Sequence, residues 1–170
     1  MKTNIILTTS IVLLLVLLSC SNNKTEAQAK NETNIKPFTA SILNSFYAEA
    51  YSVKTVLTEK ELKIILKSDL VGAKDTIVFS RLLQPSDTLR LISEININEL
   101  KDHYENPCID DGSQITVVIK KGNKIKNVHL SNYYEENIGK IIYLANSLVP
   151  EKYKIRYDKE RLLAAYNRCK

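Results

Sequence analysis

Residues Gln114 to Leu130 carry the pattern of a two-stranded β-hairpin, and this pattern limits the fold more than any other part of the sequence. Gly122-Asn123 is a typical pair of turn residues between antiparallel strands. With this turn, Lys121 lies opposite Lys124, and one face of the hairpin is formed by Ile115, Val117, Ile119, Val128 and Leu130. Because an isolated hairpin is marginal in water, the sequence predicts a larger sheet with a second layer packed on it.

The segment after the hairpin predicts the covering helix. Its apolar residues recur at helical spacing and form one stripe, made of Ile138, Ile141, Ile142, Ala145, Leu148 and Val149. Asn132 is the expected N-cap, with Glu135 three residues later as in a capping box. Pro150 is expected to end the helix. We therefore expect one long amphipathic helix over about residues 132–149.

Three other segments predict strands. The runs at residues 62–66 and 76–79 are rich in β-branched and aromatic residues and flank a loop. The run at residues 89–92 is expected to be a further short strand. Residues 42–50 fit both a helical and an alternating pattern, so either structure remains open for them.

The last elements complete the expected architecture. A short helix is expected to end near Tyr104, and residues 152–157 alternate like an edge strand. Asp158 is expected to cap a short C-terminal helix. The predicted fold class is α+β, a mainly antiparallel sheet with the helix over 132–149 packed on it and a short C-terminal helix.

Composition supports one folded domain, expected over residues 35–170. The chain has 170 residues, of which 44% are hydrophobic and 25% are charged, as in globular proteins. Four glycines and four prolines exclude a collagen-like chain, and the apolar content excludes a wholly disordered one. A single long apolar run excludes a multi-pass membrane protein.

That apolar run lies at the N-terminus and predicts a signal peptide over residues 1–19. Lys2 gives a positive start, and the run from Ile5 to Leu18 is too short for a comfortable transmembrane helix. Its length is typical of the apolar region of a secretory signal.

The residues that end this run carry a resemblance to a known class. Leu17-Leu18-Ser19-Cys20 resembles the lipobox of bacterial lipoproteins, in which the cysteine thiol receives a diacylglycerol and the signal is removed just before it. The resemblance covers about twenty residues and implies lipidation at Cys20. Overall, the chain is similar to small envelope lipoproteins of Bacteroidota, but no family is indicated for its folded domain.

The residues after Cys20 predict a tether and a location. Residues 21–34 contain no valine, leucine, isoleucine or aromatic residue, so they are expected to form a flexible spacer with a span of roughly 20 Å. Acidic residues after the cysteine mark surface export in Bacteroidota-like lipoproteins, whereas residues 21–24 here read Ser-Asn-Asn-Lys. The resemblance therefore implies the outer membrane, with the domain facing the periplasm.

Two further cysteines, Cys108 and Cys169, form an even pair in a compartment that permits disulfides. A bridge between them is the expected state, and it would stabilise the fold by roughly 4 kcal/mol in the chain-entropy model. The alternative is a reactive thiol at Cys108, with His103 five residues earlier.

Asp110-Asp111-Gly112-Ser113 is the loop with the most suggestive chemistry. Its carboxylates are of the type that binds a hard cation such as Ca²⁺, but their spacing does not match a calcium-binding loop. A turn is therefore the favoured interpretation. His103 and His129 are expected to lie apart, too few and too distant for a zinc site. The sequence therefore predicts no catalytic residue, no metal and no cofactor.

Aromatic and basic side chains mark the candidate contact surface. It consists of Tyr133, Tyr134, Lys152, Tyr153, Lys154, Arg156 and Tyr157. The expected location excludes nucleic acid as a partner and favours a protein, a peptide or a glycan of the envelope.

The sequence thus predicts a non-enzymatic, membrane-anchored binding protein. Three alternatives stay open. The first is a hydrolase or metal-dependent enzyme that uses Asp110-Asp111 with one of the histidines. The second is an inhibitor or immunity-type protein, and the third is a structural spacer in an envelope complex.

Overall fold

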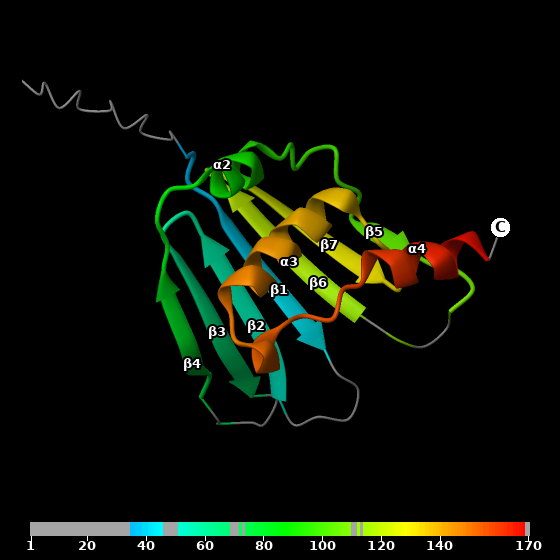
Figure 1. The fold of residues 1–170 in the computed structure, drawn as a ribbon, viewed down its shortest axis with the longest axis horizontal. Coiled ribbons are helices and arrows are strands. Elements are labelled where there is room, and N and C mark those ends of the chain that lie inside the picture. The colour runs from blue at the N-terminus through cyan, green and yellow to red at the C-terminus, as the bar shows by residue number, and fades with distance from the viewer. Residues whose placement is uncertain are drawn as a thin grey trace, which may run out of the picture. The chain divides into compact units, whose positions relative to one another are not determined.

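The computed structural model describes residues 35–45, 51–68, 72, 74–109, 112 and 114–168. In these residues a seven-stranded sheet has the strand order β4-β3-β2-β1-β6-β7-β5 (Figure 1). The strands are β1 (Thr39–Ser45), β2 (Tyr51–Thr58), β3 (Glu61–Ser68), β4 (Thr76–Leu82), β5 (His103–Glu105), β6 (Gln114–Lys121) and β7 (Lys124–Ser131). The helices are α2 (Asp87–Glu94), α3 (Glu136–Leu148), the 3-10 helix η1 (Glu151–Tyr153) and α4 (Lys159–Asn167).

All neighbouring strands are antiparallel except β5 and β7, which are parallel. The α+β class and the mainly antiparallel sheet are therefore confirmed. So are the strands predicted at residues 62–66 and 76–79, which lie in β3 and β4. The ambiguous segment at residues 42–50 is a strand as far as Ser45, and its remainder lies outside the described residues.

The hairpin of β6 and β7 has the register that its sequence predicts. Lys121 pairs with Lys124, Val117 with Val128, and Ile115 with Leu130. The predicted apolar face is the buried one, since Val117 and Val128 are fully buried. The alternation of side chains along each strand set this register, because a slip of one residue would turn the apolar set toward solvent.

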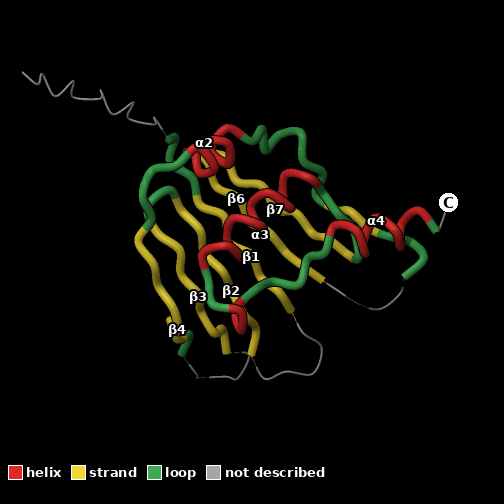
Figure 2. Tube along the Cα trace, in the orientation of Figure 1, coloured by secondary structure: helices red, strands yellow, loops and turns green. Residues whose placement is uncertain are grey.

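The helices pack on one face of the sheet, so the fold has two layers. Figure 1 shows α3 crossing this face, and Figure 2 shows the same arrangement by secondary structure. The core between the layers joins side chains of the sheet, such as Ile42, Leu57 and Ile64, to Ile138 and Ile142 of α3. Each of these side chains is nearly or fully buried.

Helix α3 is shorter than expected and begins later. Its N-cap is Glu135, whose carboxylate accepts a hydrogen bond from the backbone N–H of Ile138 at 2.7 Å. Asn132 cannot take this role, because its φ of 52° is left-handed, whereas an N-cap residue is extended. The helix therefore spans 13 residues rather than the expected range of 132–149.

The predicted strand at residues 89–92 is wrong, because these residues form the middle of α2. The Ser86 side chain caps the helix by accepting from the N–H of Leu89 at 3.3 Å. At the other end, the Lys121 ammonium donates to the carbonyl oxygens of Ile92, Ser93 and Ile95. The helix buries the side chains of Leu89 and Ile92, which lie three residues apart, together with that of Ser93.

Two more predicted elements differ. No helix ends near Tyr104, which instead lies in the short strand β5. Residues 152–157 are not an edge strand, because η1 occupies their first part and the remainder is extended without a strand partner among the described residues. The predicted cap of the last helix is confirmed, since Asp158 accepts from the N–H of Arg161 at 2.7 Å. No helix in the described part of the chain is long and apolar enough to cross a membrane.

Candidate functional site

A hydrogen-bonded tyrosine joins the start of α3 to the segment that leads into α4. The hydroxyl of Tyr157 accepts from the N–H of Glu135 at 2.8 Å and donates to the carbonyl oxygen of Tyr133 at 3.1 Å. Burial raises the pKa of Tyr157 well above its ordinary value. The side chain is therefore a fixed neutral bridge between two segments more than twenty residues apart in the sequence.

A second tyrosine packs on this bridge. The rings of Tyr134 and Tyr157 are stacked, with 5.3 Å between their centroids. The extended residues around Ile155 are held against α3 as well, because the Asn146 amide bonds both the N–H and the carbonyl oxygen of Ile155 at 2.8 Å. These contacts leave a groove between α3 and the start of α4.

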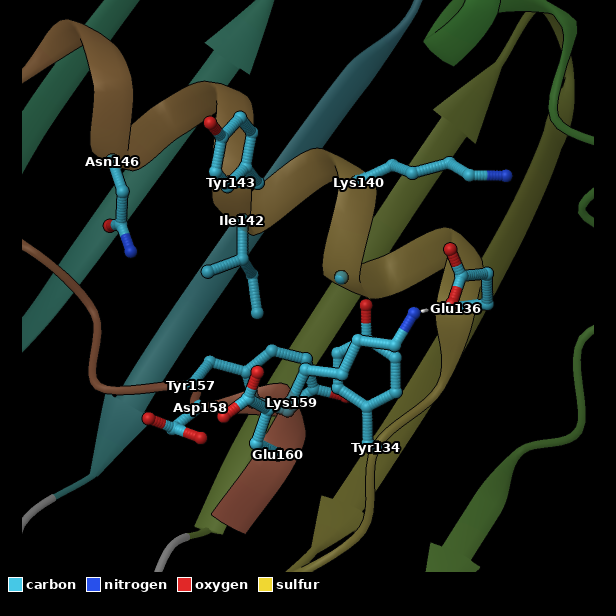
Figure 3. Close-up of a pocket in the computed structure, with 11 residues that line it drawn as sticks. Tyr134, Glu136, Lys140, Ile142, Tyr143, Asn146, Tyr157, Asp158, Lys159 and Glu160 are labelled. Carbon is cyan, nitrogen blue, oxygen red and sulfur yellow. Dashed lines mark hydrogen bonds and ion pairs between the residues drawn. The ribbon is translucent and has the colours of Figure 1, made fainter. Parts of the chain in front are cut away.

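This groove, which we name the tyrosine groove, has a volume of about 520 Å³ (Figure 3). Tyr143 and Ile142 of α3 form one side, and Tyr157 with Asp158 forms the other. Tyr143 is 78% exposed, so one aromatic side chain at the groove is available to a ligand. An exposed ring beside apolar walls is suited to stacking on a sugar ring or on an apolar peptide side chain.

Charges of both signs line the rim of the tyrosine groove. Lys159 donates to the carboxylate of Glu136 at 3.0 Å and lies over the Tyr134 ring, 5.2 Å from its centroid. The hydrogen bond to Lys159 lowers the pKa of Glu136, and the same contact raises the pKa of Lys159. Lys140 and Glu160 also line the groove, and no ion pair joins either of them to another described residue.

Gly139 forms part of the groove floor and permits the close approach of Tyr134. A Cβ atom at position 139 would lie 2.7 Å from Cζ and 2.9 Å from Cε2 of the Tyr134 ring. Real Cβ atoms do not approach other heavy atoms so closely, so a larger residue would displace the ring. Gly139, in the first half of α3, therefore has a packing role.

The structure divides the predicted contact surface among several places. Tyr134 and Tyr157 line the tyrosine groove. Lys154 and Arg156 line a neighbouring hollow of about 440 Å³, which shares Asn146, Tyr157 and Asp158 with the tyrosine groove. Tyr153 packs against Phe79, 6.2 Å between centroids, and Lys152 lies over the Tyr153 ring.

Tyr133 belongs to a partly exposed aromatic cluster apart from the tyrosine groove. Its ring stacks on Tyr104 at 5.3 Å and meets Tyr166 edge-on at 5.2 Å. Burial raises its pKa. Tyr143 was missed as a site residue, although its position off the apolar stripe of α3 was a usable signal for an exposed aromatic side chain.

The two histidines are close together, so the expectation that they lie apart is wrong. His103 pairs with His129 across the parallel strands β5 and β7, and their rings stack 5.2 Å apart. His103 Nε2 lies 3.2 Å from Glu105, and His129 Nδ1 lies 3.3 Å from Thr116. Within the described residues, no group of three or more His, Cys, Asp or Glu side chains is arranged to hold a metal.

The structure describes only some of the remaining predicted residues. Cys20, Asp110, Asp111 and Cys169 lie outside the described residues, as do the predicted signal peptide and the tether over residues 20–34. Cys108 is disulfide-bonded, and neither of the other two cysteines is described. The Cys108–Cys169 pairing therefore stays a prediction.

No protein-family model matches the chain, and no curated protein matches it either.

Proposed function

We propose that this chain is a lipoprotein of the bacterial envelope, anchored through lipid at Cys20, whose domain binds a peptide or a glycan without catalysis. The anchor rests on the resemblance of Leu17-Leu18-Ser19-Cys20 to a lipobox. The outer membrane, with the domain facing the periplasm, is the proposed location.

The observation that carries the binding role is the tyrosine groove. It combines an exposed aromatic ring, Tyr143, with apolar walls and two rim charges, Lys140 and Glu160. Binding sites of this type join apolar contact to a few polar groups that orient the ligand. The groove is also held by fixed contacts, since the Tyr157 hydroxyl and the Asn146 amide both tie its walls together.

Ligand selection on the mature protein tests this role. A displayed peptide library and an array of envelope glycans, including peptidoglycan fragments, are screened with the wild type, Tyr143→Ala and Leu91→Ala. Leu91 is the matched control, because it is an exposed apolar residue of another helix, α2. We expect ligands that lose at least about tenfold in affinity with Tyr143→Ala, the usual effect of removing an interfacial aromatic anchor, and that bind Leu91→Ala normally.

Two results would count against the binding role. One is the absence of any selected peptide or glycan at millimolar concentration. The other is a set of ligands whose affinities do not respond to Tyr143→Ala, which would place the site elsewhere.

The enzymatic alternative has one observation in its favour, the stacked pair His103 and His129. Each ring already has a polar neighbour, Glu105 or Thr116, and the stacked rings face each other rather than a common point. A hydrolase screen with ester, amide and phosphoester substrates tests this alternative. Turnover that is abolished by His129→Ala would replace the binding role with catalysis.

A further inference from the structure

The face of the sheet opposite α3, which we name the open face, is not covered by any helix among the described residues (Figure 1). We propose that this face rests on an anionic lipid surface, so that the domain lies on its membrane with the helices turned away. This proposal rests on the proposed lipid anchor, and it adds the orientation of the domain and the class of lipid that it contacts.

Strand register defines which side chains share the open face. Along each strand, side chains of the open face alternate with side chains that point into the core, such as Ile42, Leu57 and Ile64. One row across the sheet runs through Ile65, Lys54 and Leu43, which are all partly exposed. Further apolar residues on the face are Val56, Ile77, Leu82, Val118 and Ile125.

Three of these apolar side chains project strongly. Leu82 is 79% exposed, Ile125 is 61% exposed and Ile77 is 57% exposed. Ile77 and Leu82 belong to the edge strand β4, whereas Ile125 belongs to β7 near the other edge. Exposed large aliphatic side chains on both sides of one face are suited to partial insertion between lipid headgroups.

The charge on the open face is mainly positive. The strands place four lysines there, which are Lys54, Lys63, Lys67 and Lys120. Two carboxylates share the face among the strand side chains that the structure describes. Glu61 lies 2.5 Å from Lys63, and Glu105 lies at the far edge beside His103. Both carboxylates are therefore already engaged, and the remaining charge is complementary to anionic headgroups.

One end of the open face is hollowed. A depression of about 600 Å³ lies here, and its lining includes Leu82, the lysines Lys60 and Lys120, and the carboxylates of Glu59 and Glu61. Neither lysine forms an ion pair with another described residue. The two carboxylates already have partners, since Glu61 pairs with Lys63 and Glu59 accepts from the backbone N–H of Phe38 at 3.3 Å. A phosphate headgroup here would pair with the two ammonium groups, with the Leu82 side chain beside them.

The anchor favours lipid over an acidic protein as the occupant. Residues 21–34 are expected to span roughly 20 Å as a flexible tether, so the proposed lipid at Cys20 would hold the domain close to a bilayer. Under this restraint a weakly attractive face is enough to orient the domain, because the local lipid concentration is high. The tyrosine groove lies on the helix side of the sheet, so this orientation leaves it open to the periplasm.

Lysine labelling of the lipidated protein in nanodiscs tests the orientation. Acetylation is followed by mass spectrometry in discs of phosphatidylcholine alone and in discs that contain phosphatidylglycerol. We expect Lys67 and Lys120 to be labelled at least about fivefold more slowly in the anionic discs, since one lysine at such a surface contributes about this factor. Lys140 and Lys152, which are exposed on the helix side, should be labelled equally in both.

A matched pair of double variants keeps the test free of folding effects. Lys67→Glu with Lys120→Glu changes the open face, whereas Lys140→Glu with Lys152→Glu makes the same change of net charge on the helix side. With lipid-free mature protein, the first pair should lower partitioning onto phosphatidylglycerol vesicles by at least about 25-fold, and the second should change it little.

Equal labelling of all four lysines in both kinds of disc would overturn the proposal. Equal loss of vesicle binding in the two double variants would overturn it too, because the effect would then come from net charge alone. Protection of the open face only when an acidic envelope protein is added would assign the face to that protein. If Cys20 carries no lipid, the proposed function fails, while the vesicle experiment still tests the open face by itself.

Discussion

The ring of Tyr134 lies directly against Gly139 of α3, so closely that no Cβ atom fits at position 139 without moving the ring. The same ring stacks on Tyr157 and forms a wall of the tyrosine groove. A change at Gly139 is therefore transmitted to the groove through Tyr134.

Gly139→Ala should lower the free energy of unfolding of the wild type but raise that of the Tyr134→Ala variant. Alanine favours a helix interior by about 1 kcal/mol, whereas overpacking against Tyr134 costs about 1–3 kcal/mol. We expect net destabilisation in the wild type and stabilisation by about 1 kcal/mol in Tyr134→Ala, where the ring is absent. Urea unfolding of the wild type, the two single variants and the double variant measures the coupling between positions 134 and 139. Additive changes in the free energy of unfolding would contradict overpacking of Tyr134 against alanine.

Tyr157→Phe should destabilise the domain by about 1–3 kcal/mol. The substitution keeps the ring stack with Tyr134 but leaves the N–H of Glu135 and the carbonyl oxygen of Tyr133 without their hydroxyl partner. Tyr143→Phe is the control, because its side chain is exposed and should change the free energy of unfolding by less than about 0.5 kcal/mol. Equal effects of the two substitutions in urea would contradict the bridging role.

The raised pKa of Tyr157 predicts a loss of stability in alkali. Burial favours the neutral phenol in the folded protein, so the stabilising contribution is complete below the ordinary tyrosine pKa of about 10 and declines as the pH rises above it. Tyr157→Phe removes the titrating group, so its free energy of unfolding should fall less between about pH 9 and pH 11. Parallel pH dependence in the wild type and the variant would show that Tyr157 ionises normally.

Lys121→Met should destabilise the domain by about 1–3 kcal/mol, because three carbonyl oxygens at the end of α2 lose their charged donor. Lys124, its cross-strand partner, is exposed and provides the control substitution Lys124→Met. Hydrogen exchange of the α2 amides should accelerate in the first variant and stay unchanged in the second. Unchanged exchange in both would mean that α2 does not depend on Lys121.

Local patterns in the sequence were enough to predict the hairpin of β6 and β7. The turn Gly122-Asn123 and the alternation on both sides of it set strand and register together, so the pairing of Val117 with Val128 follows from these residues alone. Helix α2 was misassigned because four residues, 89–92, are too short to separate a strand from a helix by apolar content. Its deciding contacts are the Ser86 cap and Lys121, which lies almost thirty residues away.

The candidate site was predictable only in part. Tyr134 and Tyr157 were named from their aromatic character, but the groove arises from their stacking across more than twenty residues of sequence. The proximity of His103 and His129 depends on the parallel pairing of β5 with β7, which no local pattern indicates. Asn132 was a plausible helix cap by residue type, and its left-handed backbone moved this role to Glu135.

The envelope location and the tethered orientation both depend on the lipid at Cys20, so the intact mass and cell fraction of the native protein test the account most directly. The account predicts a membrane-bound protein whose first residue is Cys20 and whose mass includes acyl chains, and a Cys20→Ala variant that carries no lipid. A wild type that is soluble, uncleaved and free of acyl mass would contradict the account. The envelope location, the exclusion of nucleic acid and the tethered orientation would then all have to be given up.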